Sequence, residues 1–139
     1  MHARIRTNRR AVALLLAAML TLLPSVVLAG GHWSATAPIQ QGNENCGVDL
    51  PQLPVMGTVD FTRKGQSISM TFHLDGAAPG SSYQAELWSG DCQLVQELGT
   101  VTTDGSGDGS ATFSMRARGQ SFFATVYGDN GYNDTTIVP

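Results

Sequence analysis

Hydrophobic and polar residues alternate with a period of two along most of the chain after residue 54. The pattern is clearest in residues 67–74, where Ile68, Met70 and Phe72 are separated by polar residues. Similar stretches, some shorter or less regular, are found at 55–62, 83–88, 92–103, 110–117 and 121–127, with a further short one at 135–138. Such alternation is typical of strands that bury one face. In 55–62 it places Val55, Val59 and Phe61 on one face and Met56 on the other.

Turn-forming residues separate these stretches. Gly, Asp or Pro cluster at 75–80, 89–91 and 104–109, and Gly65 stands in the short polar segment 63–66, as expected for tight connections between antiparallel strands. No part of the chain after residue 29 shows the 3.6-residue period of an amphipathic helix. The sequence therefore predicts an all-β fold, a single antiparallel β-sandwich of immunoglobulin-like size with about six to eight strands.

The first 29 residues have the features of a signal peptide. Arg4, Arg6, Arg9 and Arg10 precede an apolar run at 11–23, and Val27-Leu28-Ala29 offers a small-residue cleavage site. The expected organisation is a signal peptide at 1–29, an irregular N-terminal arm at 30–54 and the sandwich at 55–139. We therefore expect a secreted, periplasmic or cell-surface protein without a membrane span in its mature form.

Charge narrows the range of partners. The chain has 8 Lys and Arg against 11 Asp and Glu, and the four arginines before residue 11 leave with the signal peptide. The mature chain is acidic and has no basic stripe, which argues against nucleic acid and anionic lipid as partners. The partner expected for such a domain is a protein or a glycan.

Two cysteines, Cys46 and Cys92, are present. In an oxidising compartment they predict one disulfide. The alternative, reactive or metal-bound thiols, lacks a second Cys or a His at ligand spacing from either residue.

Residues 104–110 begin like a calcium loop. Asp104, Ser106 and Asp108 supply oxygen at positions 1, 3 and 5, and Gly109 stands at position 6. Position 12, which should bring a bidentate carboxylate, is Met115, and strand patterns flank the loop. A hairpin turn is therefore the favoured interpretation. An irregular Ca²⁺ site remains the alternative, and no other cofactor is expected.

A second polar cluster at 129–134 could assist such a site through oxygen atoms of Asp129, Asn130 and Asp134. The cluster contains the Asn-Gly pair of a turn. Asn133-Asp134-Thr135 also fits a glycosylation sequon, which predicts that this segment is exposed.

Among the remaining candidates, Trp88 is the most suggestive. Trp88 and Tyr83 fall on opposite faces of one strand, so an exposed Trp88 would be able to anchor a sugar or a peptide, whereas burial under a loop or at a sheet edge is the alternative. The spacing of His32 and His73 brings neither toward a carboxylate, so no catalytic residue is predicted.

The stretch LDGAAPGSSYQAELWSGDC, residues 74–92, resembles the copper/zinc superoxide dismutase family and the related chordin-type (CHRD) sandwich domains in its Pro-Gly and Gly-Asp turns. The resemblance implies a sandwich. The copper-binding His-x-His pair of the dismutases would fall on Ala85 and Leu87, which cannot bind copper. The Thr-Thr-Asp-x-x-Gly-x-Gly pattern at 102–109 is similar to that of uncharacterised bacterial exported β domains.

Taken together, these features predict a secreted, non-enzymatic extracellular domain that acts by binding or by surface assembly. The alternative is an exported metal-binding protein, either stabilised by Ca²⁺ or a degenerate relative of the dismutases. Likeness of fold alone cannot decide between them.

Overall fold

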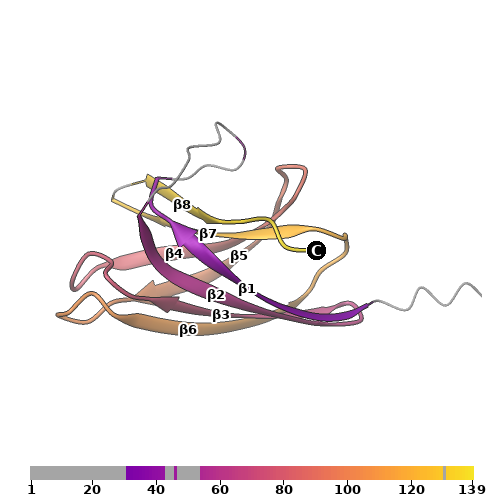
Figure 1. Cartoon of the computed structure of the whole chain (residues 1–139), viewed down its shortest axis with the longest axis horizontal. Helices are drawn as coiled ribbons and strands as arrows, with labels where there is room; N and C mark the ends of the chain where they lie inside the picture. Colours follow the sequence, from indigo (N-terminus) through magenta and orange to yellow (C-terminus); the bar gives the residue numbers. More distant parts are fainter. Residues whose placement is uncertain (1–30, 43–45, 47–53, 130) are drawn as a thin grey trace, which may run out of the picture.

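The computed structural model describes residues 31–42, 46, 54–129 and 131–139. The predicted signal peptide, 1–29, lies outside them. The described residues form eight strands and no helix (Figure 1): β1 His32–Gln40, β2 Val55–Lys64, β3 Ser67–Leu74, β4 Ser82–Ser89, β5 Leu94–Thr102, β6 Gly109–Arg116, β7 Phe122–Gly128 and β8 Gly131–Thr135. Consequently, none of the described residues belongs to a helix able to cross a membrane.

All eight strands belong to one antiparallel sheet with the order β5-β4-β7-β8-β1-β2-β3-β6. The predicted all-β antiparallel fold is therefore confirmed. The sheet curls until it is nearly closed, like a barrel (Figure 1), so it differs from a sandwich of two separate sheets. Two residue pairs, Ile39 with Thr135 and Gln40 with Asp134, join β1 to β8 and make one sheet of two four-stranded halves. We call them the β4 half (β5, β4, β7 and β8) and the β2 half (β1, β2, β3 and β6).

Side chains close the remaining seam between β5 and β6, the two end strands of the sheet. A Cβ atom added at Gly99 of β5 would lie 3.0 Å from the ring of Phe113 on β6. The absence of a side chain at Gly99 thus makes room for Phe113, which also packs edge-on against Phe72 at 5.7 Å between ring centroids. Side-chain packing thus holds β5 against β6, which are not hydrogen-bonded neighbours in the sheet.

The core fills the space between the two halves. The strongest alternation in the sequence is confirmed, because Ile68, Met70, Phe72 and Leu74 of β3 are all buried. Facing side chains of the β4 half include Tyr83, Ala85 and Leu87 of β4 and Phe122, Ala124 and Val126 of β7. Each fully buried large side chain contributes roughly 2 kcal/mol by leaving water, so the core is the main source of stability.

Strand β1 corrects the prediction of an irregular arm at 30–54. His32–Gln40 pairs with β2 along its full length. Its inward residues include Ala35 and Ala37, which give a weak hydrophobic signal, and Pro38 is normally depleted in strands. Because β8 pairs only with the last two residues of β1, most of the strand has one hydrogen-bonded neighbour, a setting in which proline is tolerated.

A bulge corrects the predicted faces at the start of β2. The register shifts so that Gln40 pairs with Val55 and Ile39 with Gly57. As a result Met56 is fully buried and Val55 is 55% exposed, the reverse of the prediction. Gly57 has a φ of 150°, and a side chain there would overlap the carbonyl of His73. A bulge inserts one residue and reverses the alternation on one side of it.

The end of the chain also differs from the prediction. The polar segment 131–135, expected to be a loop, forms β8, and Val138 makes an isolated bridge to Phe122. Asn133 is fully buried; its side chain donates to the carbonyl of Val126 at 3.0 Å and accepts from the N–H of Gly42 at 2.9 Å. The predicted exposure of this sequon is therefore wrong, because these bonds satisfy the polar side chain inside the fold.

Candidate functional site

The outer face of the β4 half carries four aromatic side chains, those of Trp88, Phe123, Tyr127 and Tyr132. Since Ala85 and Leu87 point into the core, Gln84, Glu86 and Trp88 point outward. The same alternation turns Phe123, Thr125 and Tyr127 of β7 outward. Strand pairing arranges these residues in rows: Gln84–Tyr127–Tyr132, then Glu86–Thr125–Asp134, then Trp88–Phe123.

Trp88, predicted to anchor a partner if exposed, is half-buried. Its ring stacks on Phe123 with centroids 6.2 Å apart and planes 15° apart. Its indole N–H donates to Glu86 at 2.9 Å. The two rings line a hollow of about 200 Å³ together with Cys46, Thr125, Tyr132 and Asp134. Trp88 therefore forms one wall of this first hollow, with its polar atom already bonded.

A second hollow, of about 490 Å³, lies on the same outer face toward the end of β7. It is lined by Ser82, Gln84, Thr100, Tyr127, Gly128 and Asp129. Tyr127 is 47% exposed and Tyr132 is 40% exposed. Their ring centroids are 4.7 Å apart, so the two hollows adjoin at this tyrosine pair.

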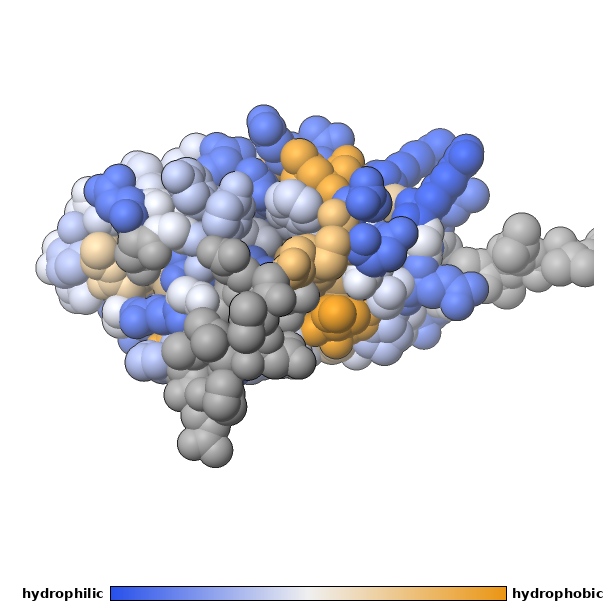
Figure 2. Space-filling view, turned by 90° about the horizontal axis from the view of Figure 1, so that it is seen from above, coloured by the Kyte–Doolittle hydropathy of each residue, from blue (hydrophilic) through white to orange (hydrophobic). Residues whose placement is uncertain are grey.

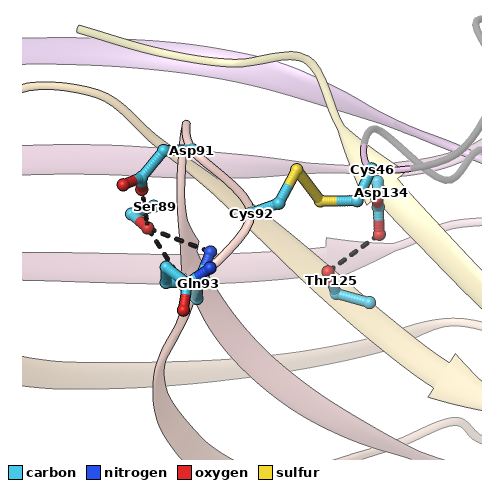
Figure 3. Close-up of a disulfide and its surroundings, with 7 residues drawn as sticks. All are labelled: Cys46, Ser89, Asp91, Cys92, Gln93, Thr125 and Asp134. Carbon is cyan, nitrogen blue, oxygen red and sulfur yellow. Dashed lines mark hydrogen bonds between the residues drawn. A yellow bond between two sulfur atoms is a disulfide. The ribbon is translucent and has the colours of Figure 1, made fainter.

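The disulfide lies at the first hollow. Cys46 and Cys92 are bonded, with Cα atoms 5.6 Å apart, and this confirms the predicted pair. Figure 3 shows the bridge running from Cys46 to Cys92, in the turn after β4, beside Thr125 and Asp134. The Thr125 hydroxyl donates to the Asp134 carboxylate at 2.8 Å. The bridge thus ties the β1–β2 connection to the β4–β5 turn at this face.

The large hydrophobic side chains exposed to solvent are few among the described residues. In Figure 2, which looks down on the β8 side, orange residues form separate small patches among hydrophilic ones. Large exposed hydrophobic side chains among the described residues are Val55, Leu94, Tyr127, Tyr132 and Ile137. Two of these five are the tyrosines of the hollows, which combine an apolar ring with a hydroxyl group.

The predicted calcium loop is a self-contained turn. One oxygen of Asp104 accepts from the hydroxyl of Ser106 at 2.7 Å, from its N–H at 2.8 Å and from the N–H of Asp108 at 3.1 Å. These bonds, led by the Ser106 hydroxyl, lower the pKa of Asp104. The carboxylate oxygen is therefore used to hold the β5–β6 turn. The predicted hairpin is wrong, because β5 and β6 are the two end strands of the sheet and do not pair with each other, so this tight turn crosses from one half to the other.

The Asp104 turn gives a pH-dependent prediction. Because the folded-state pKa is lowered, the ionised carboxylate stabilises the fold above the usual carboxyl range of about 4, and this stabilisation is lost as the pH falls through the folded-state pKa. Asp104→Asn should therefore unfold at lower urea than the parent at neutral pH, and the gap should narrow in acid. Asp75→Asn, at an exposed acid outside the turn, is the control. A gap that stays constant with pH would contradict the assignment.

The second predicted ligand cluster is divided by the fold. Strands β5 and β7 both pair antiparallel with β4, so the turns after them lie at the same end of the barrel (Figure 1). Asp129 is exposed there, whereas Asp134 is buried on β8, and Asn130 lies outside the described residues. Within the described ranges no group of three or more His, Cys, Asp or Glu side chains could hold a metal ion.

One arrangement was missed in the sequence. On the outer face of the β2 half, His73 Nε2 lies 3.4 Å from Asp60, and its Nδ1 lies 3.4 Å from the hydroxyl of Ser110. His73 and Ser110 are brought together because they are register partners on β3 and β6. From the sequence, this contact could have been found only by predicting the register of these two strands. The prediction that His73 approaches no carboxylate is therefore wrong.

This Ser110–His73–Asp60 line lacks the surroundings of a catalytic triad. The side chains of His73 and Asp60 are each 50% exposed, and neither hollow is lined by any of the three residues. The surrounding strands β2 and β3 are paired on both sides, which leaves few N–H groups for an oxyanion hole. The line is best explained as a polar surface network.

The comparisons with known proteins return nothing. No family model matches the chain, and no curated protein or solved structure matches it either.

The positions that would hold copper in a dismutase are in the core. Ala85 and Leu87 are both fully buried between the two halves. The outward positions of β4 are Ser82, Gln84, Glu86 and Trp88, none of them a histidine. β4 therefore lacks the histidine pair that binds copper in the dismutases.

Proposed function

We propose that this chain is an exported, non-enzymatic binding domain whose outer face of the β4 half binds carbohydrate. The observation that carries the proposal is the second hollow. There the exposed ring of Tyr127 is surrounded by polar groups: the hydroxyls of Ser82 and Thr100, the amide of Gln84 and the carboxylate of Asp129. A sugar presents apolar C–H faces ringed by hydroxyl groups, so its recognition needs this combination of a ring with several donors and acceptors.

The position of the site on a rigid scaffold supports the proposal. Gln84 and Tyr127 are directly paired neighbours on β4 and β7, and both strands lie inside the sheet. Side chains on central strands are held in place better than those on loops, which lowers the entropic cost of binding. A protein partner is less well supported, because the face is hollowed at two adjoining places.

Export is part of the proposal. The signal-peptide pattern at 1–29 supports it, and the Cys46–Cys92 disulfide is consistent with an oxidising compartment. The two halves of the sheet face each other across the core, which supports a sandwich-like arrangement of the kind implied by the dismutase resemblance. We draw no metal chemistry from that resemblance.

Substitution of the exposed ring tests the function. Tyr127→Ala should weaken binding to a soluble oligosaccharide about tenfold or more, the effect expected of an aromatic anchor, measured by isothermal titration calorimetry over neutral, amino and acidic sugars. Tyr127→Phe, which keeps the ring, should retain more affinity than Tyr127→Ala. His73→Ala, on the opposite half, is the control and should bind like the parent. Absence of binding to every sugar class would refute the proposal.

A further inference from the structure

The charges of the molecule are distributed unevenly between the two halves. The described residues of the β4 half and its internal turns include five acids and no Lys, Arg or His. The acids are Glu86, Asp91, Glu97, Asp129 and Asp134. All described basic residues lie on the β2 half or the connection that follows β6: His32, Arg63, Lys64, His73, Arg116 and Arg118. The outer face of the β4 half therefore has a negative potential that no described cation of that half offsets.

Two of these carboxylates are held opposite each other. Glu86 of β4 and Glu97 of β5 are direct register partners, and like charges in that position destabilise a sheet. Glu86 is half-buried, and its bond from the indole of Trp88 fixes its carboxylate beside an aromatic ring. Such a pair would be stabilised by a positively charged ligand placed between the two strands.

The aromatic row lies next to this acidic row. Each residue of the aromatic row is two positions from a residue of the acidic row on the same strand, or about 7 Å along it. The pairs are Gln84 with Glu86 on β4, Tyr127 with Thr125 on β7, and Tyr132 with Asp134 on β8. An exposed aromatic ring attracts a cation through its face. A sugar ring that stacks on Tyr127 can therefore place one of its substituents against the neighbouring row of carboxylates.

We propose that the carbohydrate bound by this face carries free, protonated amino groups, as an oligomer of glucosamine does. The inference rests on the proposed function and adds the ligand class. The tyrosine rings would contact the sugar faces, the hydroxyls and amide of the second hollow would bind sugar hydroxyls, and Glu86 and Glu97 would bind ammonium groups. Acidic sugars would be repelled by the same carboxylates.

Binding of two matched oligomers tests the inference. The full chain should bind a glucosamine oligomer about tenfold more tightly than its N-acetylated counterpart of equal length at low salt, one charge contact being sufficient for this ratio. The advantage should shrink as salt is added, because screening weakens exposed charge contacts. Glu97→Gln should remove most of the affinity advantage of the glucosamine oligomer and leave the affinity for the acetylated oligomer unchanged. Asp75→Asn, an acid outside this half, should leave the ratio unchanged.

The outcomes separate this inference from the proposed function. Equal affinity for both oligomers, with Tyr127→Ala still weakening each, would refute the amino-sugar assignment and leave carbohydrate binding in place. No binding of any sugar would refute both. If an oligolysine of matched charge bound as tightly as the glucosamine oligomer, and Glu97→Gln weakened both equally, the site would be a cation site for basic peptides and the sugar assignment would be wrong. Glu97→Gln should fold normally, because it relieves the like-charge pair.

Discussion

Exchange of both cysteines for serine should lower the free energy of unfolding by about 4 kcal/mol, the chain-entropy value for a closed loop of this size. The bonded residues are 46 positions apart, and the loop they close contains all of β2, β3 and β4. Without the bridge the unfolded chain gains freedom, while the folded chain loses the tie between the β1–β2 connection and the β4–β5 turn. Urea unfolding of the oxidised parent and of Cys46→Ser/Cys92→Ser measures the difference.

A second variant separates the cross-link from local backbone strain. Cys92 has a φ of 66°, a left-handed conformation that costs a non-glycine residue about 1 kcal/mol. Cys46→Ser/Cys92→Gly should therefore lose less stability than the double serine variant. A reductant should destabilise the parent and leave both variants unchanged. A loss below about 1 kcal/mol in the double serine variant would contradict the role given to the bridge.

Arg63→Met should destabilise the protein by about 3 kcal/mol, since bonds from a buried charged group are among the stronger ones. Arg63 is 9% exposed. Its guanidinium donates to the carbonyls of Gly65 at 2.9 Å, Gly119 at 2.6 Å and Ala117 at 3.3 Å. It also lies over the ring of Phe122, 5.3 Å from its centroid. One side chain thus fastens the β2–β3 turn to the connection after β6.

Two further substitutions, one at Arg63 itself and one at its neighbour Lys64, serve as controls for the loss of stability in Arg63→Met, measured by urea unfolding. Lys64→Met, at an exposed position, should change stability by less than about 0.5 kcal/mol. Arg63→Lys keeps the charge but loses the planar fork of donors, so its stability should fall between those of the parent and Arg63→Met. If Arg63→Met and Lys64→Met behaved alike, the carbonyl contacts would not contribute as described.

The sequence predicted the strands whose pattern is strong and missed those whose pattern is weak. β3 has large apolar residues at every second position, and its buried face was predicted correctly. β1 depends on alanines for much of its inward face, and β8 buries Asn133, Asp134 and Thr135, which appear polar in a sequence. These strands are stabilised by pairing and by side-chain hydrogen bonds to other strands, and local propensity does not report such contacts.

The candidate site was predictable only in part. The outward direction of Trp88 followed from the period of two, but its stacking partner Phe123 depends on the pairing of β4 with β7. The second hollow combines Gln84 and Thr100 of the consecutive strands β4 and β5 with Tyr127 of β7, which is distant from both in sequence. The pairing of Glu86 with Glu97 depends on a bulge in the β4–β5 register. Non-local register of this kind is set by the whole fold and leaves no local signal.

A titration followed by amide NMR tests the central claim, that the outer face of the β4 half binds carbohydrate, most directly. A glucosamine oligomer is added to the isotopically labelled protein while every backbone signal is followed. The account predicts shifts concentrated at Gln84, Glu86, Thr100 and Tyr127, with little change around His73 on the opposite half. Shifts centred on the β2 half, or none with either this oligomer or its N-acetylated counterpart at a millimolar concentration, would contradict it.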